Sequence, residues 1–166
     1  SPDDQCFERE VDLYDDGSVE AYEFGIDVDD GFDIDEAGPG HLLGSFTVGE
    51  MSGNLDEGYD FDEEGPGDID VVFTGISGSA NADDALKLSE ADGGSVYLVA
   101  TGVEFASNGG VGIVAEEEDA GNVNVALLGI ATAGNDDGEL GVEVVQEDEG
   151  EGAVYVIDSE IADGIE

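Results

Sequence analysis

The sequence predicts an all-β domain, a glycine-rich β-sandwich or small β-barrel built from two similar units of about 54 residues, with at most one short helix. First, many short segments alternate apolar and polar residues, which is the pattern of a half-buried strand. Second, the chain holds 27 glycines, and strands joined by glycine turns fit this better than helices, because an interior glycine costs a helix about 1 kcal/mol. Third, GDIDVVFTGI at residues 67–76 returns as GNVNVALLGI at residues 121–130.

The N-terminal part is predicted to hold an acidic arm, residues 1–10, ahead of a single β domain, residues 11–166. Val11 and Leu13 begin the alternation, and AYEFGIDVD continues it as a half-buried strand. The apolar positions of that strand are Tyr22, Phe24, Ile26 and Val28. A shorter alternating piece with Phe32 and Ile34 then ends at the Gly38-Pro39-Gly40 breaker.

An internal repeat sets the expected architecture. Residues 40–88 align with residues 94–142 without gaps. The identities include Glu50/Glu104, Asn54/Asn108, Gly58/Gly112, Gly67/Gly121, Val71/Val125, Gly75/Gly129, Ile76/Ile130 and Leu86/Leu140. Two copies without a third full unit are typical of a pseudo-symmetric domain, since a solenoid needs about three repeats. We therefore expect each unit to contribute the same strands.

The strands of the two units are expected between glycine turns. The ranges are 42–51, 57–62 and 68–77 in the first unit, and 95–105, 111–116 and 122–132 in the second. The core face is predicted to hold Ile69, Val71 and Phe73, with Val123, Val125 and Leu127 in the copy. Gly75 and Gly129 are expected where a strand bends. NADDALKLSEADGG is expected to be a short helix or loop, its copy NDDGELGVEVV a strand, and GAVYVID another strand.

The charge of the chain is strongly negative, with two basic residues against 45 acidic ones and a formal net charge of −43. Carboxylates spread over a globule of this mass lie about 13 Å apart, beyond the screening length of about 3 Å at 1 M salt but near that of about 10 Å at 0.1 M. The balance favours a halophilic protein; disorder, a nucleic-acid mimic and a calcium sink are alternatives. Direct nucleic-acid binding is not expected, because nothing neutralises phosphates.

Few residues suit catalysis. His41 is the sole histidine, with Ser45 as the nearest nucleophile, and we expect it to be exposed or half-buried. Cys6 lies among acidic residues, which raise a thiol pKa and make it a poor nucleophile. We predict no enzyme activity and assign no catalytic, cofactor-binding or metal-binding residue. No signal-peptide pattern or transmembrane run is expected, and no membrane partner.

The segment DVDDGFDIDE is the strongest metal candidate, although we expect a solvated acidic surface there. Its acidic residues are Asp27, Asp29, Asp30, Asp33, Asp35 and Glu36. The spacing does not fit the EF-hand loop, whose glycine falls at position six, because Gly31 is fifth from Asp27.

The stretch VYLVATGVEFASNGGVGIVAEEEDAGNVNVALLGIATA resembles small head-decoration (cement) proteins of tailed viruses, here of a virus infecting halophilic archaea. The matching parts are a glycine turn at 109–110, a short strand at 111–114, an acidic turn at 116–120 and a strand at 121–129. The resemblance implies a virion protein, a trimer over a major capsid protein, with the N-terminal arm and Phe7 adding a strand to the lattice. Other virion subunits (tail tube, turret, fibre) and an extracellular surface, pilus or matrix protein are alternatives.

Assembly is expected to use apolar residues opposite the core, since charged copies repel one another. The candidates are Val72, Thr74, Ala126, Leu128, Tyr155 and Ile157. These positions would otherwise fill the second face of a sandwich.

Overall fold

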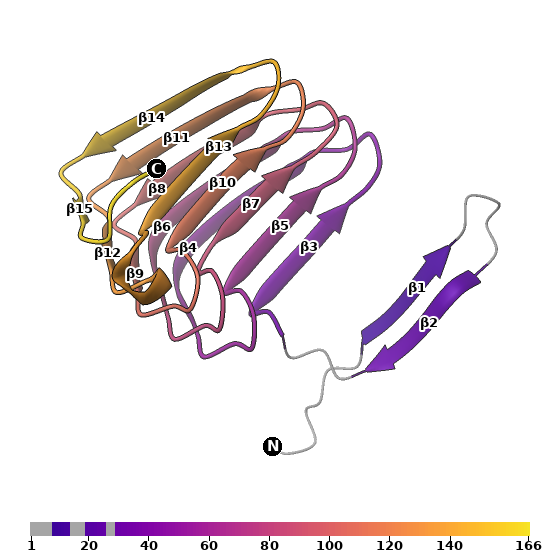
Figure 1. Cartoon of the computed structure of the whole chain (residues 1–166), viewed down its shortest axis with the longest axis horizontal. Helices are drawn as coiled ribbons and strands as arrows, with labels where there is room; N and C mark the ends of the chain where they lie inside the picture. Colours follow the sequence, from indigo (N-terminus) through magenta and orange to yellow (C-terminus); the bar gives the residue numbers. More distant parts are fainter. Residues whose placement is uncertain (1–7, 14–18, 26–28) are drawn as a thin grey trace.

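From Asp29 onward the backbone winds as a β-solenoid, in which each coil lays its strands beside those of the coil before it (Figure 1). The structure, a computed structural model, describes residues 8–13, 19–25 and 29–166. All strand pairs described in this part are parallel. The all-β prediction is confirmed, whereas the sandwich or barrel is wrong, because stacked coils and not hairpins bury the apolar rows.

Two sheets form the walls of the solenoid. The five-stranded sheet holds β3 (Phe32–Glu36), β5 (Tyr59–Glu63), β7 (Lys87–Glu90), β10 (Ile113–Glu117) and β13 (Val142–Gln146). The eight-stranded sheet, called the long sheet below, begins with β4 (Leu42–Ser52), β6 (Ile69–Ser79), β8 (Val96–Thr101), β11 (Asn122–Leu128) and β14 (Glu151–Ile157). It continues around a corner with the ends of β4 and β6, β9 (Glu104–Ala106), β12 (Ala131–Ala133) and β15 (Glu160–Ile161).

The true period is one coil of 27 residues, so the predicted unit is two coils. Asn54 Nδ2, for example, donates a hydrogen bond to Asn81 Oδ1 27 residues later, at 2.8 Å. The interpretation as a two-copy domain rather than a solenoid is therefore wrong. The repeated decapeptides nevertheless occupy equivalent strands, as predicted: they contain β6 and β11, which flank β8 in the long sheet.

The corner of the long sheet needs a left-handed backbone. Gly75, Gly102 and Gly129 take it with φ of 61°, 60° and 60°, and Val48 takes it at 51° in the first coil. The predicted bends at Gly75 and Gly129 are thus confirmed. Glycine adopts this conformation without a side-chain clash. The segments 95–105 and 122–132 each form two strands on either side of the corner, whereas β4 and β6 continue through it.

The core runs along the inside of the coils. The predicted core residues Ile69, Val71 and Phe73 are buried and lie in register with Val96, Leu98 and Ala100, and then with Val123, Val125 and Leu127. In the first coils aromatic rings add to it; Phe46 stacks on Phe73 with ring centroids 4.8 Å apart. Apolar strand alternation is therefore a correct guide to the buried rows.

The segment predicted as a helix or loop, residues 81–93, is not helical. It forms a turn and then β7, as NDDGELGVEVV forms a turn and then β13. The turn before β13 contains the short 3-10 helix η1 (Asp136–Gly138). Asn81 does not cap a helix, because its side chain bonds along the stack of coils instead.

Near the N-terminus, β1 (Glu8–Leu13) and β2 (Val19–Gly25) form an antiparallel pair of their own. β1 crosses the predicted boundary between the arm and the domain at residues 10 and 11. Cys6, Phe7, Ile26 and Val28 lie outside the described residues.

Candidate functional site

The outer face of the long sheet carries almost no charge. We use this name for the three central rows of outward side chains that the strand register aligns across β4, β6, β8, β11 and β14; the exposed Glu50 on β4 and Glu151 on β14 lie outside these rows. The rows are Leu43, Asp70, Tyr97, Asn124 and Ala153; Ser45, Val72, Val99, Ala126 and Tyr155; and Thr47, Thr74, Thr101, Leu128 and Ile157. Within these rows Asp70 alone is acidic, in a chain with 45 acidic residues.

Large apolar side chains stand out from this face. Leu43 is 73% exposed, Tyr155 64% and Ile157 53%. A shallow depression of about 180 Å³ lies between β8, β11 and β14, lined by Tyr97, Val99, Ala126 and their neighbours. All six residues predicted for assembly lie on this face and point outward, not into the second layer of a sandwich.

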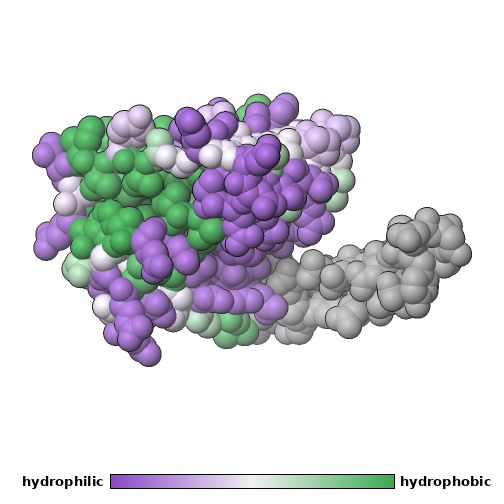
Figure 2. All heavy atoms as spheres, turned by 45° about the horizontal axis from the view of Figure 1, so that its top comes forward, coloured by the Kyte–Doolittle hydropathy of each residue, from purple (hydrophilic) through white to green (hydrophobic). Residues whose placement is uncertain are grey.

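The last coil leaves an open edge. β14 pairs with β11, and none of the described strands pairs with its other side. Val154 and Val156 are in register with the buried Val125 and Leu127, yet are 39% and 44% exposed because no described coil follows. Figure 2 shows apolar side chains gathered toward its left, where Figure 1 places β14.

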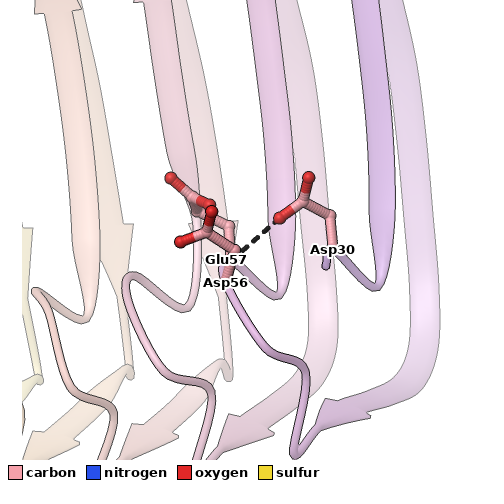
Figure 3. Close-up of side chains that lie close together, drawn as sticks. All are labelled: Asp30, Asp56 and Glu57. Atoms are coloured by element: carbon pink, nitrogen blue, oxygen red, sulfur yellow. Dashed lines mark hydrogen bonds between the residues drawn. The ribbon is translucent and has the colours of Figure 1, made fainter. Parts of the chain in front are cut away.

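An acidic cluster lies at the other end of the solenoid, on the turns before β3 and β5 and on the second residue of each of these strands. Carboxylate oxygens of Asp30, Asp56 and Glu57 lie within 4.8 Å of one another, as do those of Asp30, Asp33 and Asp60. Figure 3 shows Asp30 facing Asp56 and Glu57, with the Glu57 N–H donating to Asp30 Oδ1 at 2.9 Å. Such oxygens are the ligands that Ca²⁺ takes, so these residues are the ones suited to hold a hard cation.

Mutual repulsion and burial disturb the titration of this cluster. Burial, followed by the charges of Asp60 and Asp56, raises the pKa of Glu57 to about 8. Burial and then the charge of Asp35 raise the pKa of Asp33 to about 6. The cluster therefore takes up protons near neutral pH more readily than ordinary carboxylates.

One lysine partly offsets this charge. Lys87 Nζ lies 3.3 Å from Asp60 Oδ1 and 3.5 Å from Asp62 Oδ1. Burial lowers the pKa of Lys87, but the two carboxylates outweigh burial and hold the pKa above its ordinary value. Burial and Asp62 still raise the pKa of Asp60 to about 6, against the effect of Lys87.

The acidic residues of the segment DVDDGFDIDE, the metal candidate from the sequence, do not all lie in one cluster in the structure. Asp30 and Asp33 enter the cluster, whereas Asp27 lies outside the described residues. Asp35 lies on β3, and Glu36 accepts hydrogen bonds from the backbone N–H groups of Gly38 and Gly40 at 3.1 Å and 3.2 Å. The segment is therefore not one ligand loop, and its partners Asp56, Glu57 and Asp60 come from the next coil.

The candidates for catalysis are not brought together. His41 is exposed as predicted, and its Nδ1 accepts a hydrogen bond from the Asp68 N–H at 2.9 Å. Ser45 lies on the uncharged outer face of the long sheet. Cys6 falls outside the described residues.

Two polar columns along the coils were missed. The asparagine column is Asn54, Asn81, Asn108 and Asn135; the glutamate column is Glu36, Glu63, Glu90 and Glu117, with Gln146 at its end. In the sequence, the residues of each column recur about every 27 residues. The alignment compares residues 54 apart, so it never sets neighbouring residues of a column against each other.

Comparisons with known proteins found no match: no family model, no curated protein and no solved structure is similar to this chain. Within the described part, no helix has the length and apolar character needed to span a membrane.

Proposed function

We propose that this chain is a non-enzymatic structural subunit that assembles with further copies of itself through the outer face of the long sheet and the edge of β14. The observation that carries the proposal is the near absence of charge on that face, within a chain of net charge −43. Soluble proteins rarely expose large apolar patches unless these bind something.

A second copy is the occupant that the charges favour. Two copies repel wherever acidic surfaces meet, so close approach is least costly where both surfaces are neutral. β14 also suits pairing with a copy of itself. In an antiparallel register centred on Val154, Gly152 would face Val156, Ala153 would face Tyr155 and Glu151 would face Ile157. Small residues would thus meet large ones, and no two carboxylates would be opposed.

Two settings fit such a subunit in concentrated salt. Decoration of a viral capsid, with the major capsid protein as a further partner, is the setting that the resemblance to cement proteins implies. An extracellular surface layer or fibre is the second candidate, and the unpaired edge of β14 among the described strands supports it, because another strand can pair there.

Sedimentation at 2 M KCl tests the proposal. We expect the wild type to form oligomers at micromolar concentration and the Val99→Asp variant, with a charge in the middle of the outer face, to sediment as a monomer. Leu55→Asp is the matched control, since Leu55 is 66% exposed on a turn outside that face. A wild type that stays monomeric at every concentration rules out self-assembly.

A further inference from the structure

The glutamate column places acidic side chains inside the solenoid. Glu63, Glu90 and Glu117 are fully buried, and each is the inward-pointing last residue of its strand. Strand pairing puts Glu36 next to Glu63, Glu63 next to Glu90 and Glu90 next to Glu117. Neighbouring strands are about 4.8 Å apart, so ionised carboxylates stacked in this way would repel strongly in a dry interior.

Donors are unevenly shared along the column. Glu36 accepts two backbone N–H groups, from Gly38 and Gly40. Glu117 accepts the Asp119 N–H at 3.0 Å and the Gln146 side-chain amide. Both oxygens of each end member therefore accept a hydrogen bond from a protein N–H group.

The two middle members have fewer donors, although the backbone N–H groups of Gly67 and Gly94 act on Glu63 and Glu90 to lower their pKa values against the larger effect of burial. Glu63 Oε1 accepts the Gly65 N–H at 3.0 Å, but Glu63 Oε2 and both carboxylate oxygens of Glu90 are buried without a hydrogen-bond partner. A buried carboxylate without donors is costly, whereas a protonated carboxyl group is itself a donor.

We infer that Glu63 and Glu90 are protonated in the folded protein, Glu63 donating its O–H to Glu36 and Glu90 donating its O–H to Glu117. The column then holds two carboxyl–carboxylate hydrogen bonds that join neighbouring coils. Gln146 supports this assignment, because its amide N–H donates to Glu117 from the next coil as a protonated glutamate would.

The surroundings favour protons over a bound cation. The turns beside the column point backbone N–H groups at the carboxylates, and such donors repel a metal ion. Ca²⁺ takes six to eight oxygen ligands, far more than two stacked carboxylates offer. Lys87 lies on the same strand as Glu90, but its ammonium group pairs with Asp60 and Asp62 outside the column.

The ionisable groups around the column agree with this assignment. Burial, then the charges of Glu117 and Glu63, raises the pKa of Glu90 to about 7. Burial also raises the pKa of Glu63, and the hydrogen bond to Glu36 raises it further, against the Gly65 N–H. Buried apolar residues at the start of the long-sheet strands face the column from the opposite wall. The turns that follow β7 and β10 carry Asp92 and Asp119, and the Asp92 N–H donates a hydrogen bond to Asp119 Oδ2 at 3.0 Å.

The consequence is a loss of stability as the pH rises toward neutrality. A raised folded-state pKa means that the folded protein binds these protons more tightly than the unfolded chain does. For Glu90 the stability is fully present below the ordinary pKa of 4.5 and is lost as the pH rises toward about 7. Above that pH, adjacent carboxylates ionise inside the coils.

Infrared spectroscopy and thermal unfolding at 2 M KCl test the inference. The wild type should show a protonated carboxylic-acid carbonyl band at pH 6, and in the Glu63→Gln/Glu90→Gln variant this band should be weaker by the intensity of two carboxyl groups. The remaining intensity belongs to Glu57, Asp33 and Asp60, whose pKa values are also raised. Both melting temperatures should decrease from pH 5 to pH 8. The decrease for the double variant should be less than half of the decrease for the wild type, because glutamine stays neutral. Glu104→Gln, on the exposed surface, should keep both the band and the full pH dependence.

Two results would overturn the inference. One is a folded wild type without the carbonyl band at pH 6, which remains decisive even if the double variant does not fold. The other is a requirement for a bound cation. It would appear at pH 6 as a wild type that is folded in 2 M KCl but unfolded in 2 M tetramethylammonium chloride with a chelator, while the double variant is folded in both solutions.

Discussion

Asn81 Nδ2 donates a hydrogen bond to Asn108 Oδ1 at 3.0 Å, across two neighbouring coils of the solenoid. The Asn108 side chain in turn donates to Asn135 Oδ1 at 2.7 Å, so each carboxamide in the middle of the column both donates and accepts. These groups are buried at a corner where the backbone turns, and they satisfy backbone N–H groups of the turn as well. The column therefore fixes the coil-to-coil register at that corner.

Asn108→Ala should accordingly destabilise the fold by about 2–4 kcal/mol, since it removes the acceptor of the buried Asn81 N–H and one hydrogen bond from each of the Asn81 and Asn135 side chains. Asn122→Ala is the control: Asn122 is exposed and accepts one cross-coil bond, from the Glu151 N–H, so about 1 kcal/mol or less is expected. Chemical denaturation at 2 M KCl measures both. Equal losses for the two variants would contradict a special role for the column.

The sequence predicts the strands well because their inward rows are apolar in every coil. It misleads on the period, because the gapless 54-residue alignment leaves out the coil between the two decapeptides. That coil, GSVYLVATGV, shares four positions with the first decapeptide, as many as the two decapeptides share with each other. The glutamate column is hidden for another reason. In YDFDE, Asp60 and Asp62 point outward and Glu63 inward, but an acidic run in an acidic chain is naturally interpreted as solvated surface.

Val48 is the β-branched residue among the corner positions: it adopts φ of 51° where three other coils have glycine and the last coil has Asp158, also at 51°. Val48→Gly should stabilise the protein by about 0.5–1 kcal/mol, the relief of strain outweighing the entropy cost of glycine. Gly102→Val, the reverse change at the equivalent corner, should destabilise it, although no atom lies within 4 Å of the added Cβ. If the melting temperatures of both variants change in the same direction, the backbone of Val48 is not strained.

Salt should control folding of the isolated chain. We expect a β-type circular dichroism spectrum at 2 M KCl and a largely unfolded or expanded chain below about 0.2 M, because self-repulsion of 45 carboxylates is screened only in concentrated salt. The measurement is a salt titration at constant pH. A spectrum that stays unchanged down to 20 mM salt would remove the halophilic explanation of the charge.

Glu57 in the acidic cluster should make its own contribution to pH dependence. Its folded-state pKa of about 8 exceeds the ordinary 4.5, so the stability that it contributes declines as the pH rises through that window. Glu57→Gln should therefore gain stability over the wild type progressively from pH 5 to pH 8. Glu64→Gln, at an exposed turn position, should show a difference from wild type that does not depend on pH. Denaturant midpoints across this range provide the comparison.

Assembly through β14 should respond to salt in the direction opposite to a charge-driven complex. Apolar burial strengthens as salt is excluded from the surface, and screening weakens the repulsion between copies, so the oligomer fraction should rise from 1 M to 3 M KCl. Val156→Lys places a charge at the inward side of the open edge, a change that natural sheets use to block edge pairing. We expect this variant to remain folded by circular dichroism and to sediment as a smaller species, while Leu55→Lys on a distant turn sediments like the wild type. An oligomer that dissociates as KCl rises, or one that Val156→Lys leaves intact, would exclude the β14 edge as the contact.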